Sequence, residues 1–248
     1  RMRVLVCDDE KLARDRLARL TEAVADTEVV AEAGNGREAV TLAQSTRPDV
    51  VLLDIRMPDM DGIEAARHLL KLEHPPAVIF CTAYDEHALQ AFKVQAVDYL
   101  LKPVSREDLA AALGRVKSLT RSRLEALEQE VHGDGEPGQR RHISARTHRG
   151  IELVPVDEIR YFLADQKYVT VKHPGGEVLI DDTLKELEDE FGERFVRIHR
   201  NALVAVAWLE GMELANAGHY QVRLKGVEEK LVVSRRHVAG LRKMMARL

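Results

Sequence analysis

The sequence predicts a doubly wound α/β domain with five parallel strands, followed by a second, mostly β domain. The length of 248 residues suits two domains at roughly 150 residues for each. Apolar runs alternate with amphipathic stretches through residues 1–120, whereas short runs separated by turns dominate from residue 142 onward. Hydrophobic residues make up 45% and charged residues 31%, which is ordinary for a globular protein and excludes disordered, collagen-like and coiled-coil chains.

Five apolar runs in the first domain are typical of strands. Because they do not alternate with polar residues, they predict a parallel sheet that is covered on both faces. Between them, apolar residues recur every three or four positions, which predicts amphipathic helices. The predicted strands are 3–7, 28–33, 50–53, 77–81 and 98–101.

A last helix is predicted to begin near Ser105. Its apolar spacing continues as far as Val131, so we expect this helix to run beyond the domain as a connection. Residues 132–139 (HGDGEPGQ) then contain three glycines and a proline without any apolar residue, which predicts a flexible linker. The predicted domains are therefore 1–120 and 142–248, with a helical extension and linker at 121–141.

The second domain reads as a set of short strands with two helical intervals. Turn sequences such as PGG at 174–176 separate the strands, which favours a mostly β module. The helical intervals are 183–190 and 236–247. The predicted strands are 151–154, 159–163, 168–172, 178–180, 203–206, 220–224 and 231–233.

Composition excludes several classes of function. Aromatic residues make up only 4%, too few for the stacked rings that bind single-stranded nucleic acid. The two cysteines lack the spacing of a zinc site, and no run approaches the roughly 18 apolar residues of a membrane span, so we expect a cytoplasmic protein. The net charge of -4 argues against a basic surface overall, yet residues 234–248 hold five basic and no acidic residues, which leaves room for a local basic face.

Three acids stand where two predicted strands of the first domain end. Asp8 and Asp9 follow VLVC, and Asp54 follows VVLL. Because the carboxyl ends of parallel strands face one crevice, these side chains could converge. Helix capping is an alternative for Asp8 or Asp9, although it does not explain Asp54. Crowded carboxylates repel one another unless a cation binds, and a set of oxygen ligands favours Mg²⁺.

Two more polar residues end strands of the same sheet. Thr82 follows VIFC, and Lys102 follows DYLL. A hydroxyl, an ammonium and a metal ion around one carboxylate form a site for a phosphoryl group held on that carboxylate. Each residue alone is weak evidence, but together they predict a phosphoryl-acceptor site.

The first domain resembles a bacterial response-regulator receiver domain, which has a flavodoxin-like fold. The resemblance implies that Asp54 is phosphorylated, that Asp8 and Asp9 hold Mg²⁺ with it, and that Arg56 supplies a carbonyl ligand. The matching segments are DDE at 8–10, LLDIRMPDMDG at 52–62, CTA at 81–83 and DYLLKP at 98–103.

The same resemblance assigns roles to three further residues. It implies that Thr82 and Lys102 contact the phosphoryl oxygens and that Tyr99 is a switch aromatic. A half-buried strand tyrosine is the alternative for Tyr99. The peptide between Lys102 and Pro103 is expected to be cis, which an X-Pro bond permits.

Basic residues cluster at two places in the second domain, in FVRIHRNALV at 195–204 and VSRRHVAGLRKMM at 233–245. A solvated charged strand is the alternative for the first cluster. In the second, Ser234 is a plausible N-cap, and the arginine pair after it could reach phosphate or a guanine edge. A catalytic triad of Ser234, His199 and Asp165 lacks any supporting motif.

The second domain resembles the LytTR output domain, a mostly β DNA-binding module. The resemblance rests on IRYFLADQKYVTVKH at 159–173 and on the two basic segments. It implies that loops, rather than one recognition helix, contact the DNA. The implied contact residues are Asp165, Lys167, Tyr168, His199, Arg200, Asn201, Ser234, Arg235 and Arg236.

These resemblances predict a transcription factor of a two-component system, without enzymatic activity. We expect a cognate sensor histidine kinase to phosphorylate it, double-stranded promoter DNA to be its target, and a homodimer to form at least in the active state. Two other interpretations fit the same residues. One is a scaffold whose second domain binds proteins, and the other is a Mg²⁺-dependent phosphatase, which would need an acid where Arg56 stands.

Overall fold

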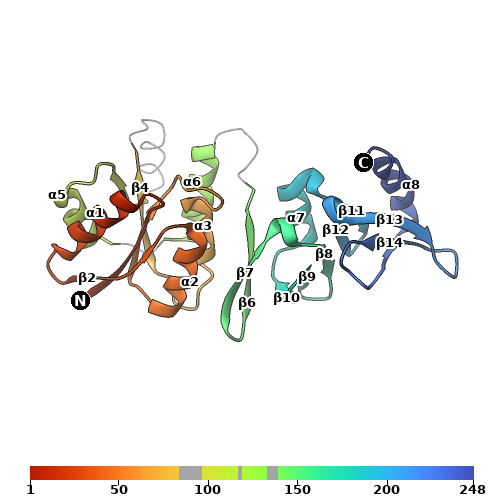
Figure 1. Cartoon of the computed structure of the whole chain (residues 1–248), viewed down its shortest axis with the longest axis horizontal. Coiled ribbons are helices and arrows are strands. Elements are labelled where there is room, and N and C mark those ends of the chain that lie inside the picture. Colours follow the sequence, from red (N-terminus) through yellow and green to blue (C-terminus); the bar gives the residue numbers. More distant parts are fainter. Residues whose placement is uncertain (84–96, 117–118, 133–138) are drawn as a thin grey trace. The chain divides into compact units, whose positions relative to one another are not determined.

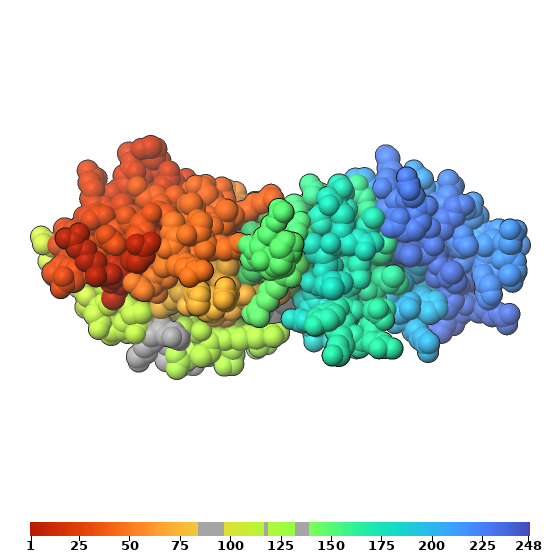
Figure 2. Space-filling model, turned by 90° about the horizontal axis from the view of Figure 1, so that it is seen from below, coloured from red at the N-terminus to blue at the C-terminus, as the bar shows by residue number. Residues whose placement is uncertain are grey.

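Two compact units make up the chain in the computed structural model (Figure 1), which describes residues 1–83, 97–116, 119–132 and 139–248. The first unit contains residues 1–142 and 148–151, and the second contains 143–147 and 152–248. Figure 2 shows the chain in space-filling form, coloured from red at the N-terminus to blue at the C-terminus. None of the helices in these described ranges is long and apolar enough to cross a membrane.

A five-stranded parallel sheet lies at the centre of the first unit, with strand order β2-β1-β3-β4-β5. The middle strands are apolar on both faces, and residues such as Leu52 and Ile79 are completely buried. The predicted parallel α/β fold is confirmed. The strands are β1 (Met2–Cys7), β2 (Thr27–Ala33), β3 (Val50–Asp54), β4 (Ala77–Thr82) and β5 (Tyr99–Leu101).

Helices cover this sheet, and several begin at a capping residue. The side chains of Asn35, Asp61 and Ser105 each accept a hydrogen bond from the backbone N–H three residues further on. α1 packs against α5, and α2 packs against α3. The described helices of this unit are α1 (Lys11–Glu22), α2 (Gly36–Thr46), α3 (Gly62–Leu69), α5 (Arg106–Gly114) and α6 (Arg121–His132).

The prediction of one long helix from Ser105 to Val131 is wrong. α5 ends at Gly114, where the poor helix propensity of glycine favours termination, and Arg115 leaves the helical conformation. A separate helix, α6, follows and packs on α3, with an ion pair between Arg67 and Glu128. Apolar periodicity continues across both helices because both have a buried face, so periodicity alone does not reveal the break.

The second unit is mostly β, as predicted. Its main sheet is antiparallel with the order β10-β9-β8-β12-β11, and a second antiparallel sheet has the order β13-β14-β15. The strands of the main sheet are β8 (Tyr161–Ala164), β9 (Val169–His173), β10 (Gly176–Ile180), β11 (Phe195–His199) and β12 (Ala202–Ala205). The others are β6 (His142–Thr147), β7 (Gly150–Pro155), β13 (Leu209–Leu214), β14 (Tyr220–Leu224) and β15 (Leu231–Val233). Two helices, α7 (Leu184–Phe191) and α8 (Arg235–Met245), complete the unit with three 3-10 turns, η1 (Val156–Glu158), η2 (Gly192–Arg194) and η3 (Val206–Trp208).

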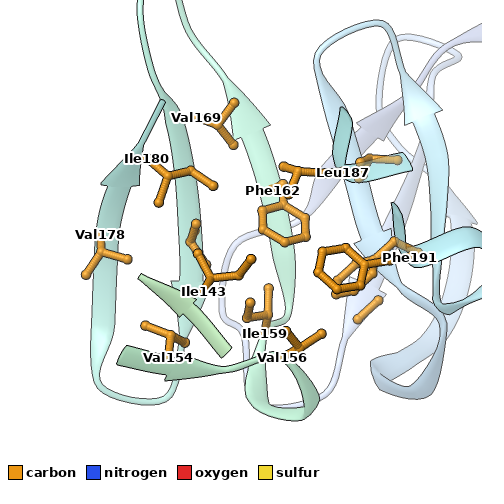
Figure 3. Packing of buried hydrophobic residues seen from close by; sticks show 14 of the residues in the cluster. Ile143, Val154, Val156, Ile159, Phe162, Val169, Val178, Ile180, Leu187 and Phe191 are labelled. Carbon is orange, nitrogen blue, oxygen red and sulfur yellow. The ribbon is translucent and has the colours of Figure 1, made fainter. Parts of the chain in front are cut away.

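The main sheet of the second unit is packed on both faces. On one face, Phe162 and Phe191 pack with the hairpin residues Ile143 and Val154 in a single apolar cluster (Figure 3). The neighbouring residue Tyr161 belongs to a different cluster, which contains side chains of β14, β15 and α8. Because consecutive strand residues point to opposite faces, α7 lies on one side of the sheet, whereas the small sheet and α8 lie on the other.

Two strands, β6 and β13, were not predicted, and β11 was considered only as the alternative of a solvated charged strand. β11 carries Arg197 and His199 beside buried Phe195 and Ile198, so its pattern looks like a charged segment. Its pairing with β12 makes it a strand all the same. Pairing with the next strand along the chain thus overrides the weak local pattern.

Candidate functional site

The acids at the ends of β1 and β3 come together as the sequence predicts. In the sheet, Cys7 pairs with Leu53, so the residues that follow these two positions, Asp8 and Asp54, lie side by side. One oxygen from each of Asp8, Asp9 and Asp54 lies within 4.8 Å of the others. Asp8 and Asp54 are buried, whereas Asp9 is exposed, so the cluster opens to solvent on one side.

Lys102 joins this cluster from the end of β5. Its Nζ lies 2.9 Å from Asp8 Oδ2 and 3.2 Å from Asp54 Oδ2, so one ammonium bridges two carboxylates. The peptide between Lys102 and Pro103 is cis. Thr82 ends the neighbouring strand β4, and its hydroxyl donates to its neighbour, the Ala83 carbonyl, at 3.0 Å.

The electrostatics of the pocket favour a bound cation. Burial raises the pKa of Asp54 to about 6, the ammonium of Lys102 opposes this, and the charges of Asp8 and Asp9 add to it. Burial lowers the pKa of Lys102, but its bonds to Asp8 and Asp54 outweigh that effect and raise it, so the side chain stays charged. A single ammonium therefore does not fully compensate the three carboxylates.

The two thiols near this pocket are unreactive at neutral pH. Cys7 and Cys81 are both buried and free. Burial raises the pKa of Cys81 to about 12 and moves the pKa of Cys7 higher still. Because the thiolate is the reactive form, neither residue is suited to nucleophilic or redox chemistry at neutral pH.

Gly62 is a site residue that the sequence analysis missed. It begins α3 directly after the loop that follows Asp54, and its N–H donates to the Ile55 carbonyl at 2.8 Å. A Cβ atom at this position would lie 2.0 Å from the Asp54 carbonyl oxygen. The glycine of PDMDG, which closes the loop onto a helix, was the available signal.

Two predicted receiver residues lie beside the pocket's strands. Arg56 is exposed in the loop after β3. Tyr99 is half-buried in β5 and pairs with Phe80 of β4. A helix is also expected at residues 86–95, before Tyr99, and this segment lies outside the described residues.

The first predicted DNA-binding loop joins β8 to β9. Asp165, Lys167 and Tyr168 are all exposed, and the loop closes through a hydrogen bond from the Asp165 N–H to the Tyr168 carbonyl. The N–H of Ala164, just before the loop, donates to the Asn201 carbonyl at 2.7 Å. This bond holds the loop next to the second predicted segment.

The second segment is the turn between β11 and β12. Arg200 is exposed, and its carbonyl accepts a hydrogen bond from Arg197 Nη1 at 2.7 Å. The N–H of Asn201 lies 3.4 Å from Nδ1 of His199. The turn is therefore rigidified by its own side chains.

The third segment, Ser234 to Arg236, opens α8 and lies beside this turn. The Ser234 N–H donates to the Ile198 carbonyl at 2.9 Å, one residue before His199. Arg235 and Arg236 are both exposed. All three predicted segments thus gather at one end of the main sheet.

The Ser234 prediction is confirmed for the N-cap position, although the capping bond is absent. Ser234 occupies the N-cap position, but its hydroxyl caps no backbone N–H of α8. The hydroxyl oxygen instead lies 2.5 Å from Nδ1 of His237. A nearby imidazole competes for the hydroxyl, and the sequence analysis did not identify His237 as a partner.

Comparisons with known proteins match both units. Residues 4–114 match the model for the response regulator receiver domain, and residues 149–246 match that for the LytTr DNA-binding domain. The Positive alginate biosynthesis regulatory protein of Pseudomonas aeruginosa is 56% identical over 249 residues and covers 100% of both chains, in agreement with a resemblance to this regulator, AlgR, that the sequence itself suggests.

The chain is also similar to a second relative and to a solved receiver domain. The Sensory transduction protein LytT of Bacillus anthracis is 35% identical over 246 residues, covering 98% of this chain and 99% of that protein. Among solved structures, the signal receiver domain of the response regulator NarL from Mycobacterium tuberculosis is 35% identical and covers 46% of this chain and 98% of that chain, with a TM-score of 0.41.

Proposed function

This chain belongs to the two-component response regulators that combine a receiver domain with a LytTR DNA-binding domain, and from that membership we propose which residues carry its functions. As a member, it regulates transcription. The proposed division is a receiver at 1–120, a helical extension and linker at 121–141, and a DNA-binding domain at 142–248.

Asp54 is the proposed phosphoryl acceptor. One of its carboxylate oxygens attacks the phosphorus of a phosphohistidine on a sensor kinase, so that an O–P bond forms while the P–N bond breaks and the imidazole nitrogen keeps the electron pair. The observation that carries this proposal is the bridging of Asp54 and Asp8 by Lys102. Lys102 and Thr82 would then contact the phosphoryl oxygens, and Tyr99 would respond to the change.

The acids of this pocket suit a magnesium ion. Three carboxylates with oxygens within 4.8 Å of one another form an all-oxygen donor set of the kind that Mg²⁺ prefers. Asp8, Asp9 and Asp54 would hold the ion together with the carbonyl of Arg56. Bound there, Mg²⁺ supplies positive charge to the transferred phosphoryl group.

Chemical phosphorylation tests this site. With Mg²⁺ and a small acyl-phosphate donor, the chain should gain one acid-stable, base-labile phosphoryl group. Asp54→Asn should abolish the labelling, and Asp59→Asn, a matched change at an exposed loop acid, should retain it. Equal labelling of Asp54→Asn and the unchanged chain would refute the assignment.

The end of the main sheet is the proposed surface for double-stranded promoter DNA. Three segments meet there, joined by the bonds from Ala164 to Asn201 and from Ser234 to Ile198. Their exposed cations, Arg200, Arg235 and Arg236, suit a phosphate backbone, and loops at a rigid sheet end suit base contacts. Lys167, Tyr168 and Asp165 would contribute from the first loop, and His199 and Asn201 from the turn.

Selection of bound fragments from genomic DNA tests this surface. Arg200→Ala or Arg236→Ala should cost about 1 to 3 kcal/mol and relax preference at one position if that arginine contacts a base, whereas loss of a phosphate contact should weaken all sequences alike. Arg19→Ala, which removes the same charge from an exposed position in α1, is the control. Unchanged affinity in both test variants at low salt would exclude this surface.

The proposal extends to assembly, location and target genes. We expect a homodimer at least in the phosphorylated state, since two copies discriminate a site better than one small module. A DNA target and two free thiols suit the cytoplasm. The chain's target genes would resemble those of its alginate-regulating relative, and its own chemistry would be limited to accepting and losing a phosphoryl group.

A further inference from the structure

The N-terminus of α8 lacks the side-chain capping bond that four other described helices have, and in this it resembles α1, where Glu10 makes no such bond. At α2, α3, α5 and α7, a polar side chain at the N-cap accepts the backbone N–H three residues further on. Ser234 has the extended backbone conformation of such a cap, yet its hydroxyl makes no capping bond. The hydroxyl instead contacts a side chain of α8.

His237 engages it. Nδ1 of His237 lies 2.5 Å from the Ser234 hydroxyl oxygen, and the same oxygen lies 3.5 Å from the Ile198 carbonyl. His237 lies in the first turn of α8, three residues after Ser234, and its ring reaches back over the start of the helix. The cap position and the ring therefore form a pair within one helical turn.

The surroundings of His237 keep its ring neutral at pH 7. Burial lowers the pKa of His237, and the positive charges of Arg236 and Arg197 lower it further, while Glu188 opposes them. A neutral imidazole can accept a hydrogen bond from a hydroxyl through one ring nitrogen. The pair is thus suited to a bond from the Ser234 hydroxyl to Nδ1.

This bond acts at the junction between two of the proposed DNA-binding segments. The Ser234 N–H donates to the Ile198 carbonyl at 2.9 Å, and Ile198 precedes the turn that contains Arg200. If the hydroxyl rotated to cap α8, it would leave Ile198 and take up a backbone N–H of the helix. The orientation of the Ser234 side chain therefore determines whether its hydroxyl lies at this junction or at the helix N–H groups.

We propose that His237 is a positioning residue for DNA binding, which holds the Ser234 hydroxyl at the junction of α8 with the β11–β12 turn, in an orientation in which the oxygen does not cap the helix. This inference rests on the proposed DNA surface. His237 itself needs no contact with DNA. His237 affects DNA binding by fixing the position of the Ser234 hydroxyl.

Three substitutions in the full chain separate this role from general stability. His237→Gln keeps a side chain of similar size, but its amide group replaces Nε2 and not Nδ1. His237→Asn places an amide group near the position of Nδ1 and should restore the bond. We expect His237→Gln to bind about three- to tenfold more weakly and His237→Asn to bind nearly as the unchanged chain does, the size expected for one hydrogen bond.

The DNA probe is the duplex that the unchanged chain retains most strongly from genomic fragments. His237→Gln should lower affinity for it without lowering the melting temperature, because the released hydroxyl can cap α8. A merely structural residue would lower both together. In a double-mutant cycle, His237→Gln should have no further effect once Ser234 is alanine.

Two results would overturn the inference. The first is unchanged affinity in His237→Gln, and the second is full additivity of the Ser234 and His237 substitutions. Failure of the proposed DNA function looks different, since the unchanged chain would then retain no duplex at all.

Discussion

The ammonium of Lys102 lies 2.9 Å from Oδ2 of Asp8, a residue 94 positions earlier in the chain. The same Nζ lies 3.2 Å from Asp54 Oδ2, so Lys102 occupies the space between two carboxylates of the proposed metal site. A metal ion and the Lys102 ammonium would therefore compete for the same carboxylate oxygens. This competition underlies the first prediction.

Lys102→Ala should bind Mg²⁺ at least as tightly as the unchanged chain, because the substitution removes a cation that competes for Asp8 and Asp54. Its response to phosphorylation should nevertheless be impaired, since no ammonium would face the phosphoryl group. Titration calorimetry with Mg²⁺ measures the affinity. Lys11→Ala, which removes an exposed lysine paired with Asp15, should change neither property. Weaker Mg²⁺ binding by Lys102→Ala would contradict the prediction.

Asp54→Asn should stabilise the metal-free protein at pH 8 by about 1 to 2 kcal/mol, because folding raises the carboxyl pKa from 3.8 to about 6. A raised pKa means that the charged carboxylate opposes folding above pH 6, and this penalty fades as the pH falls toward 4. The advantage of the asparagine should therefore shrink over that window. Melting temperatures in chelator at pH 8 and pH 5 test this. An equal advantage at both pH values would be inconsistent with it.

Gly62→Ala should disrupt the phosphorylation pocket, because the new Cβ would lie 2.0 Å from the Asp54 carbonyl oxygen. We expect a loss of about 2 kcal/mol or more in unfolding free energy, together with slower labelling of Asp54. Gly114→Ala is the matched control, since a Cβ there meets nothing within 4 Å at the end of α5. Its effect should be neutral or slightly stabilising. Similar behaviour of the two alanine variants would show that the close approach is tolerated.

Arg160→Ala should destabilise the second unit. The Arg160 guanidinium carbon lies 3.4 Å from the centroid of the Trp208 ring, and Nη1 donates to the Glu158 carbonyl at 2.6 Å. Loss of the stacked cation should cost about 1 to 2 kcal/mol. Urea unfolding followed by the fluorescence of Trp208, the single tryptophan, reports on this region. Arg146→Ala, an exposed arginine of β6, should leave the transition in place.

Phosphorylation of Asp54 should shift the chain from monomer toward dimer and raise its apparent affinity for DNA. The reason is that a phosphoryl group drawing Thr82 inward would free space for Tyr99 to turn, which changes the receiver surface near β5. Sedimentation of the phosphorylated and unmodified forms measures the association constants. Identical constants would reject the dimer switch and leave release of an inhibitory contact as the route to activation.

Local sequence predicted most of the first unit. Its strands are apolar on both faces, which one short window reveals, and the apolar residues that recur every three or four positions between them mark the helices. The division of the connecting helix was not predicted, because the buried faces of α5 and α6 follow one another with similar periodicity. β11 was only an alternative interpretation, since its charged residues weaken the apolar pattern, and pairing with β12 shows that the alternative of a charged strand is correct.

The sequence by itself determined where polar groups stand relative to strands and helices, and it places Asp8 and Asp54 at strand ends. Parallel pairing then made them neighbours, because the register of a sheet follows from its buried apolar residues. Only the tertiary structure decided the partner of Ser234. Three partners are available to its hydroxyl: a backbone N–H of α8, the His237 ring and the carbonyl of Ile198, which is 36 residues from Ser234 in the sequence. Which partner the hydroxyl contacts depends on the distances between segments, and no local sequence pattern encodes those distances.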